Sequence, residues 1–550
     1  MKKIVVTSAL PYANGSIHLG HLVEYIQTDI WVRFQRMMGN EVYYICADDT
    51  HGTPIMIKAQ EEGIEPEKLI AKVHEEHSKD FSDFFISFDN FYSTNSKENE
   101  EISGEIFKKL SKNNKISKKE IEQFFDEEKN MFLPDRFIKG ECPKCRAKEQ
   151  YGDSCESCGA TYNPTDLNNP YSSLSGTTPV LKKTEHYFFK LSECGEFLKE
   201  WLSTNILQKE AENKIQEWFE SGLQDWDITR DAPYFGFLIP GETNKYFYVW
   251  LDAPIGYMAS FQNFIKEKNI NFDEFWSANS KTELYHFIGK DILYFHALFW
   301  PSTLEFSGYR KPTKIFAHGF LTVDGEKMSK SRGTFITARS FLDFVNSPET
   351  LRYYYASKLN DSMSDIDLNI DDFANKVNSD LVGKLINIAS RSFGFLRKFY
   401  ENKLLDFNAF KDSESINLVN ASVTIKSEVL KHYESRNFGH SIRTIFKVVE
   451  LVNEFISKKE PWVMVKQEGF DETVLHEILT VAAFTFRNFI ILLSPVLPEL
   501  SKSVSLLFKE NDFISFDAIH FYPSEIIEFK HLMKRVEKEQ LEKLIESNKK

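Results

Sequence analysis

Residues 4–21, which read IVVTSALPYANGSIHLGH, decide the fold of this chain. The apolar run at 4–6 is typical of a strand that is buried on both faces of a parallel sheet. Residues 14–16 supply turn-forming and helix-capping side chains, and the pattern after them is helical. His18 and His21 are three residues apart, so they share one face of the first helical turn. The stretch therefore predicts a strand, a tight turn and a helix start, the opening of a parallel α/β domain.

The same turn offers a place for an anion. Free backbone N–H groups and the positive end of a helix favour negative charge, and two imidazoles flank that point. Gly20 adds no side-chain bulk, so a flat ligand could approach the backbone closely. Such a turn can bind nucleotide phosphates and stabilise charge that develops on them. The alternative is that both histidines are solvated surface residues, so a second, distant element has to agree.

Length and composition indicate a chain of several globular domains. At 550 residues it is too long for one compact domain, so roughly two to four are expected. Hydrophobic residues at 42% and charged residues at 27% are ordinary for a globular protein. Lys+Arg 67 against Asp+Glu 81 gives a net charge of −14, which excludes a uniformly basic nucleic-acid-binding surface. An RNA partner would have to meet a local patch.

The sequence favours a cytoplasmic protein with no membrane partner. The apolar run after Met1 is too short for a signal peptide, and it contains Thr7 and Ser8. The longest apolar stretches near the C-terminus, such as 489–493, fall far short of a membrane span.

A second buried strand is predicted at 42–47, after a first helix that ends near Met38. Asp48 and Asp49 stand at the carboxyl end of this strand, where open α/β sheets bind ligands. An acidic pair in a loop is commonly a solvated turn. Its position here predicts that one carboxylate faces the site and holds a substrate ammonium group. Residues 64–114 read as surface helices.

Two Cys-x-x-Cys pairs lie nine residues apart. Their spacing predicts one tetrahedral zinc site. Disulfides or redox pairs are the alternative, which a cytosolic context disfavours. Four thiolates leave no open coordination position, so the zinc would be structural. The four cysteines are Cys142, Cys145, Cys155 and Cys158.

The sheet is expected to resume near residue 227. Residues 246–251 read as a strand with a turn at 252–257, and 284–289 reads as another strand, followed by a helix. The segment between 115 and 226 would then be an insertion that splits one nucleotide-binding domain. Aromatic residues at helical spacing are commonly core, but several here follow the binding edge of the sheet. They include Trp250, Tyr257 and His296.

A cationic loop, GEKMSKSRG, occupies residues 325–333. A run of lysines is commonly solvated surface. On a mobile loop, however, Lys330 could close over a triphosphate and offset the charge of departing pyrophosphate.

The last third of the chain predicts a helix bundle, because apolar residues recur every three or four positions. Asn387, Arg391 and Trp462 could contact unstacked bases there, although each alone reads as helix surface or packing. Residues 530–550 read as a solvated terminal helix.

The predicted fold class is α/β: a Rossmann-type doubly wound parallel sheet, split by a zinc-binding insertion and followed by a C-terminal α-helical bundle. The expected divisions are 1–114 and 227–320 for the two halves of the Rossmann domain, 115–226 for the insertion with its zinc knuckle, 321–384 for the cationic loop and the region that follows it, 385–530 for the helix bundle, and 531–550 for the C-terminal helix.

Two short motifs together resemble the signatures of class I aminoacyl-tRNA synthetases. They are HLGH at 18–21 and KMSKS at 327–331. Residues 9–15, 250–257 and 289–291 look like the methionyl-tRNA synthetase family of the bacterial single-zinc type. The likeness runs from about residue 3 to residue 530.

The resemblance implies two reactions. ATP, with Mg²⁺, and methionine give methionyl-adenylate and pyrophosphate, and the methionyl group then passes to the 3′ end of initiator or elongator tRNA(Met). Many members of the family carry a further C-terminal dimerisation domain that is missing here, so a monomer is expected.

The resemblance also implies roles for individual residues. Arg230 would hold Asp49, which with the Leu10 backbone takes the methionine ammonium. The catalytic residues would be His18, His21, Lys327 and Lys330. ATP would contact Tyr12, Gly20, Glu24, Gly289, Asp291, His318 and Lys330. Methionine would contact Ala9, Leu10, Tyr12, Asp49, Trp250, Pro254, Tyr257, Ile292, Phe295, His296 and Trp300. The anticodon would contact Asn387, Arg391 and Trp462.

Physical chemistry agrees with an aromatic pocket, because a thioether is polarizable and makes good contacts with aromatic rings. Tyr257 and His296 could donate weakly to the sulfur. The insertion is short and holds the zinc site, so homocysteine is expected to be rejected in the synthetic site itself.

Two other functions compete with this one. The first is an adenylyl-transferring enzyme of the same fold without tRNA, which the helical last third disfavours. The second is a non-catalytic RNA-binding or zinc-ribbon scaffold, which would not need both phosphate-site motifs.

Overall fold

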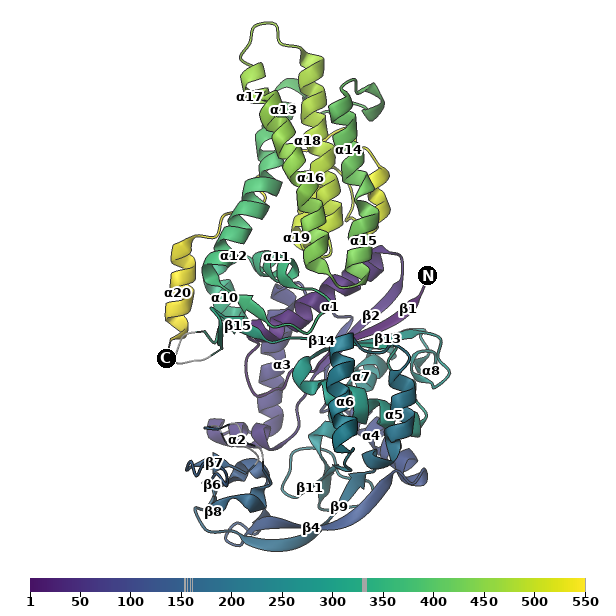
Figure 1. The fold of residues 1–550 in the computed structure, drawn as a ribbon, viewed down its shortest axis with the longest axis vertical. Coiled ribbons are helices and arrows are strands. Elements are labelled where there is room, and N and C mark those ends of the chain that lie inside the picture. Colours follow the sequence, from purple (N-terminus) through teal and green to yellow (C-terminus); the bar gives the residue numbers. More distant parts are fainter. Residues whose placement is uncertain (153–154, 156, 159, 161, 329–333, 550) are drawn as a thin grey trace.

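A computed structural model describes residues 1–152, 155, 157–158, 160, 162–328 and 334–549. Figure 1 shows an elongated molecule with a helical bundle at one end, an antiparallel β insertion at the other and a parallel sheet between them. The active site predicted from the sequence falls in the middle part.

The central sheet is parallel throughout and, among the described residues, has five strands. They are β1 (Lys3–Ser8), β2 (Glu41–Asp48), β3 (Asn90–Ser93), β13 (Glu283–Gly289) and β14 (Lys314–His318). The order β14-β13-β1-β2-β3 reverses between β1 and β13, and ligands bind outside the carboxyl ends of the strands at such a reversal. The predicted Rossmann-type sheet is confirmed. The short edge strand β3 was missed, since residues 64–114 were read as helices only.

Alternate strand residues bury opposite faces of this sheet. Ile4 and Val6 join the core beneath α1 (Leu19–Met37), whereas Val5 joins the core formed with the helices of the other face. Both faces are therefore covered, as in a doubly wound sheet. The helices of the second core are α4 (Lys97–Lys112), α7 (Val249–Ile265), α8 (Phe272–Trp276) and α9 (Trp300–Ser307). Two further helices, α2 (Thr53–Glu62) and α3 (Pro66–Asp83), follow β2.

The insertion is built on a long antiparallel ribbon. It pairs β4 (Ile116–Asp126) with β9 (Val180–Phe189), and its edges are β5 (Met131–Phe132) and β10 (Trp226–Asp227). The cysteine pairs lie beside a smaller sheet of β6 (Ile138–Glu141), β7 (Gln150–Tyr151) and β8 (Asn168–Ser172). Helices α5 (Gly195–Leu202) and α6 (Lys209–Ser221) return the chain to the central part.

The strand predicted at 246–251 is wrong in extent and in place. Only β12 (Lys245–Phe247) is extended there, and it pairs with β11 (Thr229–Asp231) outside the central sheet. Helix α7 begins at Val249, so Trp250 and Tyr257 lie on a helix. The aromatic, β-favouring composition misled the prediction, because burial of the helix against the sheet outweighs intrinsic propensity.

A small three-stranded unit connects the sheet to the bundle. It contains β15 (Leu321–Val323), β16 (Glu326–Lys327) and β17 (Ile366–Leu368), with α10 (Ala338–Val345) and α11 (Pro348–Lys358) between the last two. The cationic loop leaves this unit after β16.

The C-terminal bundle confirms the predicted helical region. It begins with a run of α12 (Ile370–Lys376), a π-helical segment (Val377–Ile386) and α13 (Asn387–Tyr400). The remaining helices are α14 (Ser413–Thr424), α15 (Lys426–Glu434), α16 (Phe438–Lys459), α17 (Pro461–Met464), α18 (Glu472–Leu493) and α19 (Pro498–Leu507). By length and composition α18 could cross a membrane, contrary to the expectation from the sequence, but 89% of its apolar window is buried inside the bundle.

The terminal helix α20 (Lys538–Asn548) is not the solvated helix expected from its mixed charges. Leu541 and Leu544 are buried, and the Gln540 side chain donates to the Phe344 carbonyl just before the end of α10. In Figure 1 this yellow helix lies beside α10 and α12. Apolar residues at 541 and 544 are three apart and define the buried stripe.

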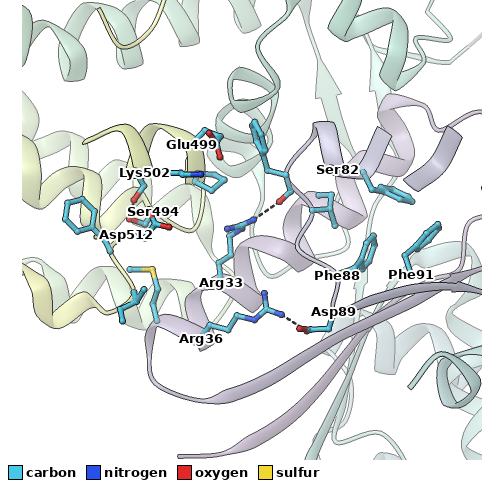
Figure 2. Close-up of a pocket in the computed structure, with 18 of the residues that line it drawn as sticks. Arg33, Arg36, Ser82, Phe88, Asp89, Phe91, Ser494, Glu499, Lys502 and Asp512 are labelled. Atoms are coloured by element: carbon cyan, nitrogen blue, oxygen red, sulfur yellow. Dashed lines mark hydrogen bonds and ion pairs between the residues drawn. The ribbon is translucent and has the colours of Figure 1, made fainter. Parts of the chain in front are cut away.

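The bundle is fixed to the sheet domain by a buried ion pair. Arg352 of α11 donates to the Asp29 carboxylate of α1 at 2.7 Å and to the carbonyls of Pro495 and Val496 after α18. A cavity of about 810 Å³ opens beside this joint. Figure 2 shows that Arg33 and Arg36 of α1 face Ser494, Glu499 and Lys502 of the bundle across it.

Candidate active site

His18 and His21 cap the helix that carries them. The backbone N–H of His21 donates to His18 Nδ1 at 3.3 Å, and that of His18 donates to His21 Nδ1 at 3.4 Å. The two rings stack with centroids 3.6 Å apart. Because each Nδ1 accepts a hydrogen bond, the proton of each neutral ring lies on Nε2. Burial lowers the pKa of His18 to about 4 and that of His21 well below its ordinary value, so both rings are neutral donors at pH 7.

Met328 in the cationic loop and Phe335 just after the loop both contact this turn. A Cβ on Gly20 would lie 2.6 Å from the Met328 methyl group, so the end of the Met328 side chain lies directly over Gly20. The Phe335 ring packs edge-on against His18 at 5.0 Å. Leu19 N–H donates to the Ile336 carbonyl at 2.9 Å, so the chain after the loop runs beside the start of α1. The two motifs that are more than three hundred residues apart in sequence therefore meet.

Of the two lysines predicted to be catalytic, one is described. Lys327 ends β16 and is exposed. Lys330 lies outside the described residues.

A buried acid–imidazole pair lies beside the strand reversal. His318, at the end of β14, contacts Glu24 Oε2 through Nε2 at 3.1 Å, and its Nδ1 donates to the Gly319 carbonyl at 2.7 Å. Burial raises the pKa of Glu24, and the Glu24 carboxylate raises that of His318 although burial opposes it. Glu24 Oε1 is buried without a partner among the described residues, so it can accept from a ligand.

Gly289 ends β13 at the same edge. A Cβ there would lie 2.4 Å from Asp291 Oδ1, so the missing side chain lets this carboxylate fold back over the strand end. The structure thus brings Gly20, Glu24, Gly289, Asp291 and His318 to one side of the His18–His21 turn.

Of the acidic pair Asp48 and Asp49, Asp49 is the residue that lines two neighbouring cavities. It follows β2, and its backbone pairs with Tyr12, so the two residues lie side by side. Its Oδ1 is buried without a partner among the described residues. Burial, followed by the nearby Asp252 carboxylate, raises the pKa of Asp49 well above its ordinary value. A ligand cation would reverse that shift.

An apolar cavity of about 120 Å³ opens beside Asp49. Trp250, Pro254 and Tyr257 reach it from one face of α7. Gly256 lets α7 approach Leu10 closely, because a Cβ there would lie 3.1 Å from the Leu10 side chain. The full lining is Leu10, Asp49, Val249, Trp250, Ala253, Pro254, Tyr257, Ile292, Phe295 and His296.

Tyr257 and His296, which were predicted to donate to a ligand sulfur, are hydrogen-bonded to each other instead. His296 Nδ1 donates to the Ile292 carbonyl at 3.2 Å, so its Nε2 accepts the Tyr257 hydroxyl at 3.0 Å. Burial lowers the pKa of His296 to about 4, which keeps the ring neutral. The Tyr257 proton therefore points to His296, and what these groups offer a ligand is polarizable surface.

Three other residues predicted to contact methionine do not line this cavity. Trp300 is fully buried behind Tyr257, where its Nε1 donates to His286. Ala9 is half-buried at the end of β1, and its carbonyl accepts from Tyr25. Tyr12 lines an adjoining cavity of about 390 Å³ instead, together with Asp49 and Arg230.

Arg230 does not hold Asp49 in the described structure. Its guanidinium lies 3.6 Å from Asp227 Oδ2 and stacks 3.6 Å from the centre of the Tyr248 ring. The resemblance implied this pair, whereas in the structure the Tyr248 ring and Asp227 take the guanidinium.

The four predicted zinc ligands converge. Their sulfur atoms lie within 4.8 Å of one another, and no disulfide joins the six cysteines, all of which are described. Backbone N–H groups of Lys144 and Cys145 donate to Cys142 Sγ at 3.4 Å, and that of Cys158 donates to Cys155 Sγ at 3.3 Å. N–H groups directed at sulfur stabilise thiolates. The donor set fits tetrahedral zinc.

The predicted base-contacting residues gather near the far end of the bundle. The Arg391 guanidinium lies 4.2 Å from the centre of the Trp462 ring and donates to Ser457 Oγ at 3.2 Å. Asn387 precedes Arg391 by one turn on α13.

Sequence reasoning missed a set of buried polar residues behind the site. His51 contacts Asp252 at 2.5 Å, and His286 contacts Thr7 at 2.5 Å. Asp48 contacts two histidines of α3. A polar residue next to an apolar strand was the available signal, but pairing partners more than twenty residues away cannot be read from one sequence.

Comparisons with known proteins agree with one another. A family model described as tRNA synthetases class I (M) matches residues 4–393. The methionine–tRNA ligase of Neisseria meningitidis serogroup A is 54% identical over 567 aligned residues, which cover 100% of this chain and 81% of that protein. The methionine–tRNA ligase of Thiobacillus denitrificans is 54% identical over 549 residues, covering 100% and 79%. The solved structure of Mycobacterium tuberculosis methionyl-tRNA synthetase in complex with methionyl-adenylate has the same fold, with a TM-score of 0.79, 24% identity, and coverage of 97% and 100%.

Proposed function

The chain belongs to the methionine–tRNA ligases of class I, and from that premise we propose how its residues divide the reaction between them. It is an aminoacyl-tRNA synthetase: it activates methionine with ATP to methionyl-adenylate and pyrophosphate, and then transfers the methionyl group to the 3′ end of initiator and elongator tRNA(Met).

The phosphates bind at the start of α1. The observation that carries this assignment is the stacked histidine pair, whose Nδ1 atoms are both engaged by backbone N–H groups. Each ring is thereby committed to offer an Nε2–H donor, and neutral donors fixed in place stabilise charge that develops on the α-phosphate. The donors are already oriented before the reaction, so no reorganisation is needed.

The lysines of the cationic loop neutralise the departing pyrophosphate. Met328 and Phe335 anchor the loop at Gly20 and His18. Lys330 follows Met328 by two residues in the sequence, and two residues of extended chain span at most about 7 Å. Lys327 is exposed on the same loop.

ATP extends from the histidine turn toward the carboxyl ends of β13 and β14. Gly289 and Asp291 border the adenosine, and Glu24 with His318 closes the far side. Tyr12 borders the cavity next to Asp49. We expect Mg²⁺ to arrive with the ATP phosphates, as is usual for this ion, and to offset part of their charge.

Methionine binds between Asp49 and α7. The buried Asp49 carboxylate pairs with the ammonium group, next to the Leu10 backbone. The thioether lies against Trp250, Tyr257, Phe295 and His296, which supply polarizable surface. Pro254 and Ile292 complete the wall, while Ala9 and Trp300 support it from behind.

The bundle reads the anticodon, and the insertion holds one structural zinc. Trp462, already stacked with Arg391, offers a face for an unpaired base, and Asn387 offers an amide on the same side. Four thiolates fill the zinc coordination sphere, so this ion takes no part in the chemistry. We expect the enzyme to work in the cytoplasm, and sedimentation of the purified chain tests the expected monomer.

The deciding experiment is pyrophosphate exchange with each of the twenty amino acids, followed by charging of tRNA(Met). Exchange that depends on methionine, with charging of tRNA(Met), is the expected outcome. Exchange without charging would support an adenylyl-transferring enzyme that does not use tRNA, and no exchange would contradict the proposal.

A further inference from the structure

A histidine bridges the end of β2 and the turn that precedes α1. His77, on α3, contacts Asp48 Oδ1 through Nδ1 at 2.6 Å and the Gly15 carbonyl through Nε2 at 2.7 Å. The His77 and Asp48 side chains are 1% and 0% exposed. Gly15 stands three residues before His18, so the bridge ends at the turn that carries the phosphate site.

The two groups bonded to His77 determine the protonation of its ring. A carboxylate and a carbonyl oxygen can only accept, so both ring nitrogens of His77 must donate. The ring is therefore an imidazolium in this arrangement. Burial alone would lower the pKa of His77, but the hydrogen bond and the charge of Asp48 raise it above its ordinary value.

Titratable and charged groups of α1, α3 and α10 lie near the bridge. On α3, His74 donates to the other oxygen of Asp48 at 2.6 Å, and Asp80 raises the pKa of His77. Arg339 of α10 pairs with Asp80 at 2.6 Å. On α1, burial lowers the pKa of His21, and the charges of His18 and His77 lower it further.

Other contacts hold the turn on either side of Gly15, and after it Ala338 N–H donates to the Ile17 carbonyl at 2.8 Å. Ala13 N–H donates to the Asp49 carbonyl at 2.8 Å, and the Lys58 ammonium donates to the Asn14 carbonyl at 2.6 Å from an exposed position. Nothing lies within 4 Å of a Cβ built on Gly15, so side-chain packing does not fix this residue. His77 supplies a buried, charge-assisted bond there, and such bonds are about twice as strong as neutral ones.

We propose that His77 is a positioning residue: its bridge from Asp48 to Gly15 sets the turn in the geometry that aims His18 and His21 at the ATP phosphates. It touches neither ATP nor methionine. This inference rests on the proposed roles of His18 and His21.

Two substitutions separate the halves of the bridge. His77→Asn places an amide N–H near the position of Nδ1, so it keeps the partner of Asp48 but cannot reach Gly15. His77→Gln extends an amide N–H to the position of Nε2 and keeps the bond to Gly15. His74→Asn is the matched control, because His74 also donates to Asp48 but has no bond to the turn.

The measurement is pyrophosphate exchange, with KM for ATP and for methionine determined separately. His77→Asn should lower kcat/KM for ATP about ten- to hundredfold, because small displacements of a catalytic group have effects of that size. KM for methionine and the values for His74→Asn should stay within about twofold of wild type. His77→Gln should lie between wild type and His77→Asn. If His77→Asn does not fold, judged by its melting temperature, a loss specific to ATP in His77→Gln decides.

Two results would overturn the inference. One is an equal change in KM for ATP and for methionine, which a merely structural role would produce. The other is an equal loss in His74→Asn and His77→Asn. A wild-type chain without methionine-dependent exchange would instead contradict the proposed function, so the two failures can be told apart.

Discussion

Asp49 shows how a single buried charge can prepare a site. Its Oδ1 lies in the interior with no partner among the described residues, and its pKa is raised well above the ordinary value by burial. Such a carboxylate is costly in the free enzyme and regains a partner when an ammonium group binds. We therefore expect affinity and stability to change in opposite directions at this residue.

Replacing Asp49 with Asn tests this. Loss of a charge-assisted bond should weaken methionine binding by about 1.5–3 kcal/mol, roughly ten- to hundredfold. The melting temperature of the unliganded enzyme should rise, since the substitution removes a group whose charged form is disfavoured by burial and by Asp252. Calorimetric titration with methionine and thermal unfolding measure the two effects. The exposed Asp343→Asn is the control, and a lower melting temperature for Asp49→Asn would contradict the argument.

Trp462 carries a separate prediction for tRNA. Trp462→Ala removes a stacking face next to Arg391 and should weaken recognition of tRNA(Met) by about 1–3 kcal/mol. Methionine-dependent pyrophosphate exchange should not change, because the site for that step lies in another domain. Val463→Ala, at an exposed neighbour, is the control. An equal fall in exchange and charging would rule out an anticodon role.

At the residue scale the sequence predicted individual site residues but not the contacts between side chains. His18 and Asp49 come after predicted strands, and the four cysteines have a fixed spacing, which a sequence displays. The Arg230–Asp49 pair failed because Tyr248 takes the guanidinium, and that competition exists only after folding.

The helix α1 joins the phosphate site to the bundle. It has 19 residues, so it is about 28 Å long, with the histidine pair at its start and Asp29 in its middle. Asp29 accepts from Arg33 on the same helix and from Arg352 of α11, which also holds the carbonyls after α18. One buried carboxylate thus connects three parts of the chain.

This pairing predicts how stability depends on pH. Burial alone would raise the pKa of Asp29, but Arg33 and Arg352 lower it to about 2. A lowered pKa in the folded state stabilises the protein above the unfolded value near 3.8, here by on the order of 2 kcal/mol. That contribution should be lost as pH falls from about 4 to about 2.

Urea unfolding at pH 7 and near pH 3 measures this effect. Asp29→Asn should destabilise the enzyme at pH 7 by about 3–5 kcal/mol, because it leaves the buried Arg352 and the partly buried Arg33 without their anion. The same variant should lose less additional stability between the two pH values than wild type does. Parallel losses in both proteins would show that other carboxylates control acid unfolding.

Helices and strands were predicted well where the hydrophobic pattern has a single clear period. They were predicted poorly where the residue composition suggests one structure and burial in the fold favours another. The apolar runs of β1, β2 and β13 are correct to within a residue or two. The aromatic residues at 246–251 suggested a strand, yet residues 249–251 begin α7, because a helix buried against a sheet is apolar on several sides. The buried stripe of α20 was hidden by charges of both signs around it.

At the scale of the whole molecule the zinc knuckle of the insertion has a small core of its own. Its knuckle packs through Phe137, Ile138 and Leu167, and Ile57 of α2 lies against this small core. The catalytic cavities are lined mainly by other elements. Loss of the metal should therefore loosen the knuckle without unfolding the sheet.

Zinc removal tests this independence. A strong chelator or Cys142→Ser should release a single zinc ion per chain, expose the remaining thiols and open the knuckle to proteolysis. The main unfolding transition should remain. The control is Cys194→Ser, a buried cysteine outside the cluster. Retention of the full metal content in Cys142→Ser would show that the cluster is not the zinc site.

The mutual capping of His18 and His21 has an evolutionary consequence. Asn or Ser at position 18, with Gln at position 21, would satisfy the same backbone N–H groups and still begin the helix. After gene duplication, two substitutions could thus produce a paralogue without catalytic activity that still folds and still binds nucleic acid. Natural pseudoenzymes of this architecture should be sought among well-folded proteins altered at these two positions.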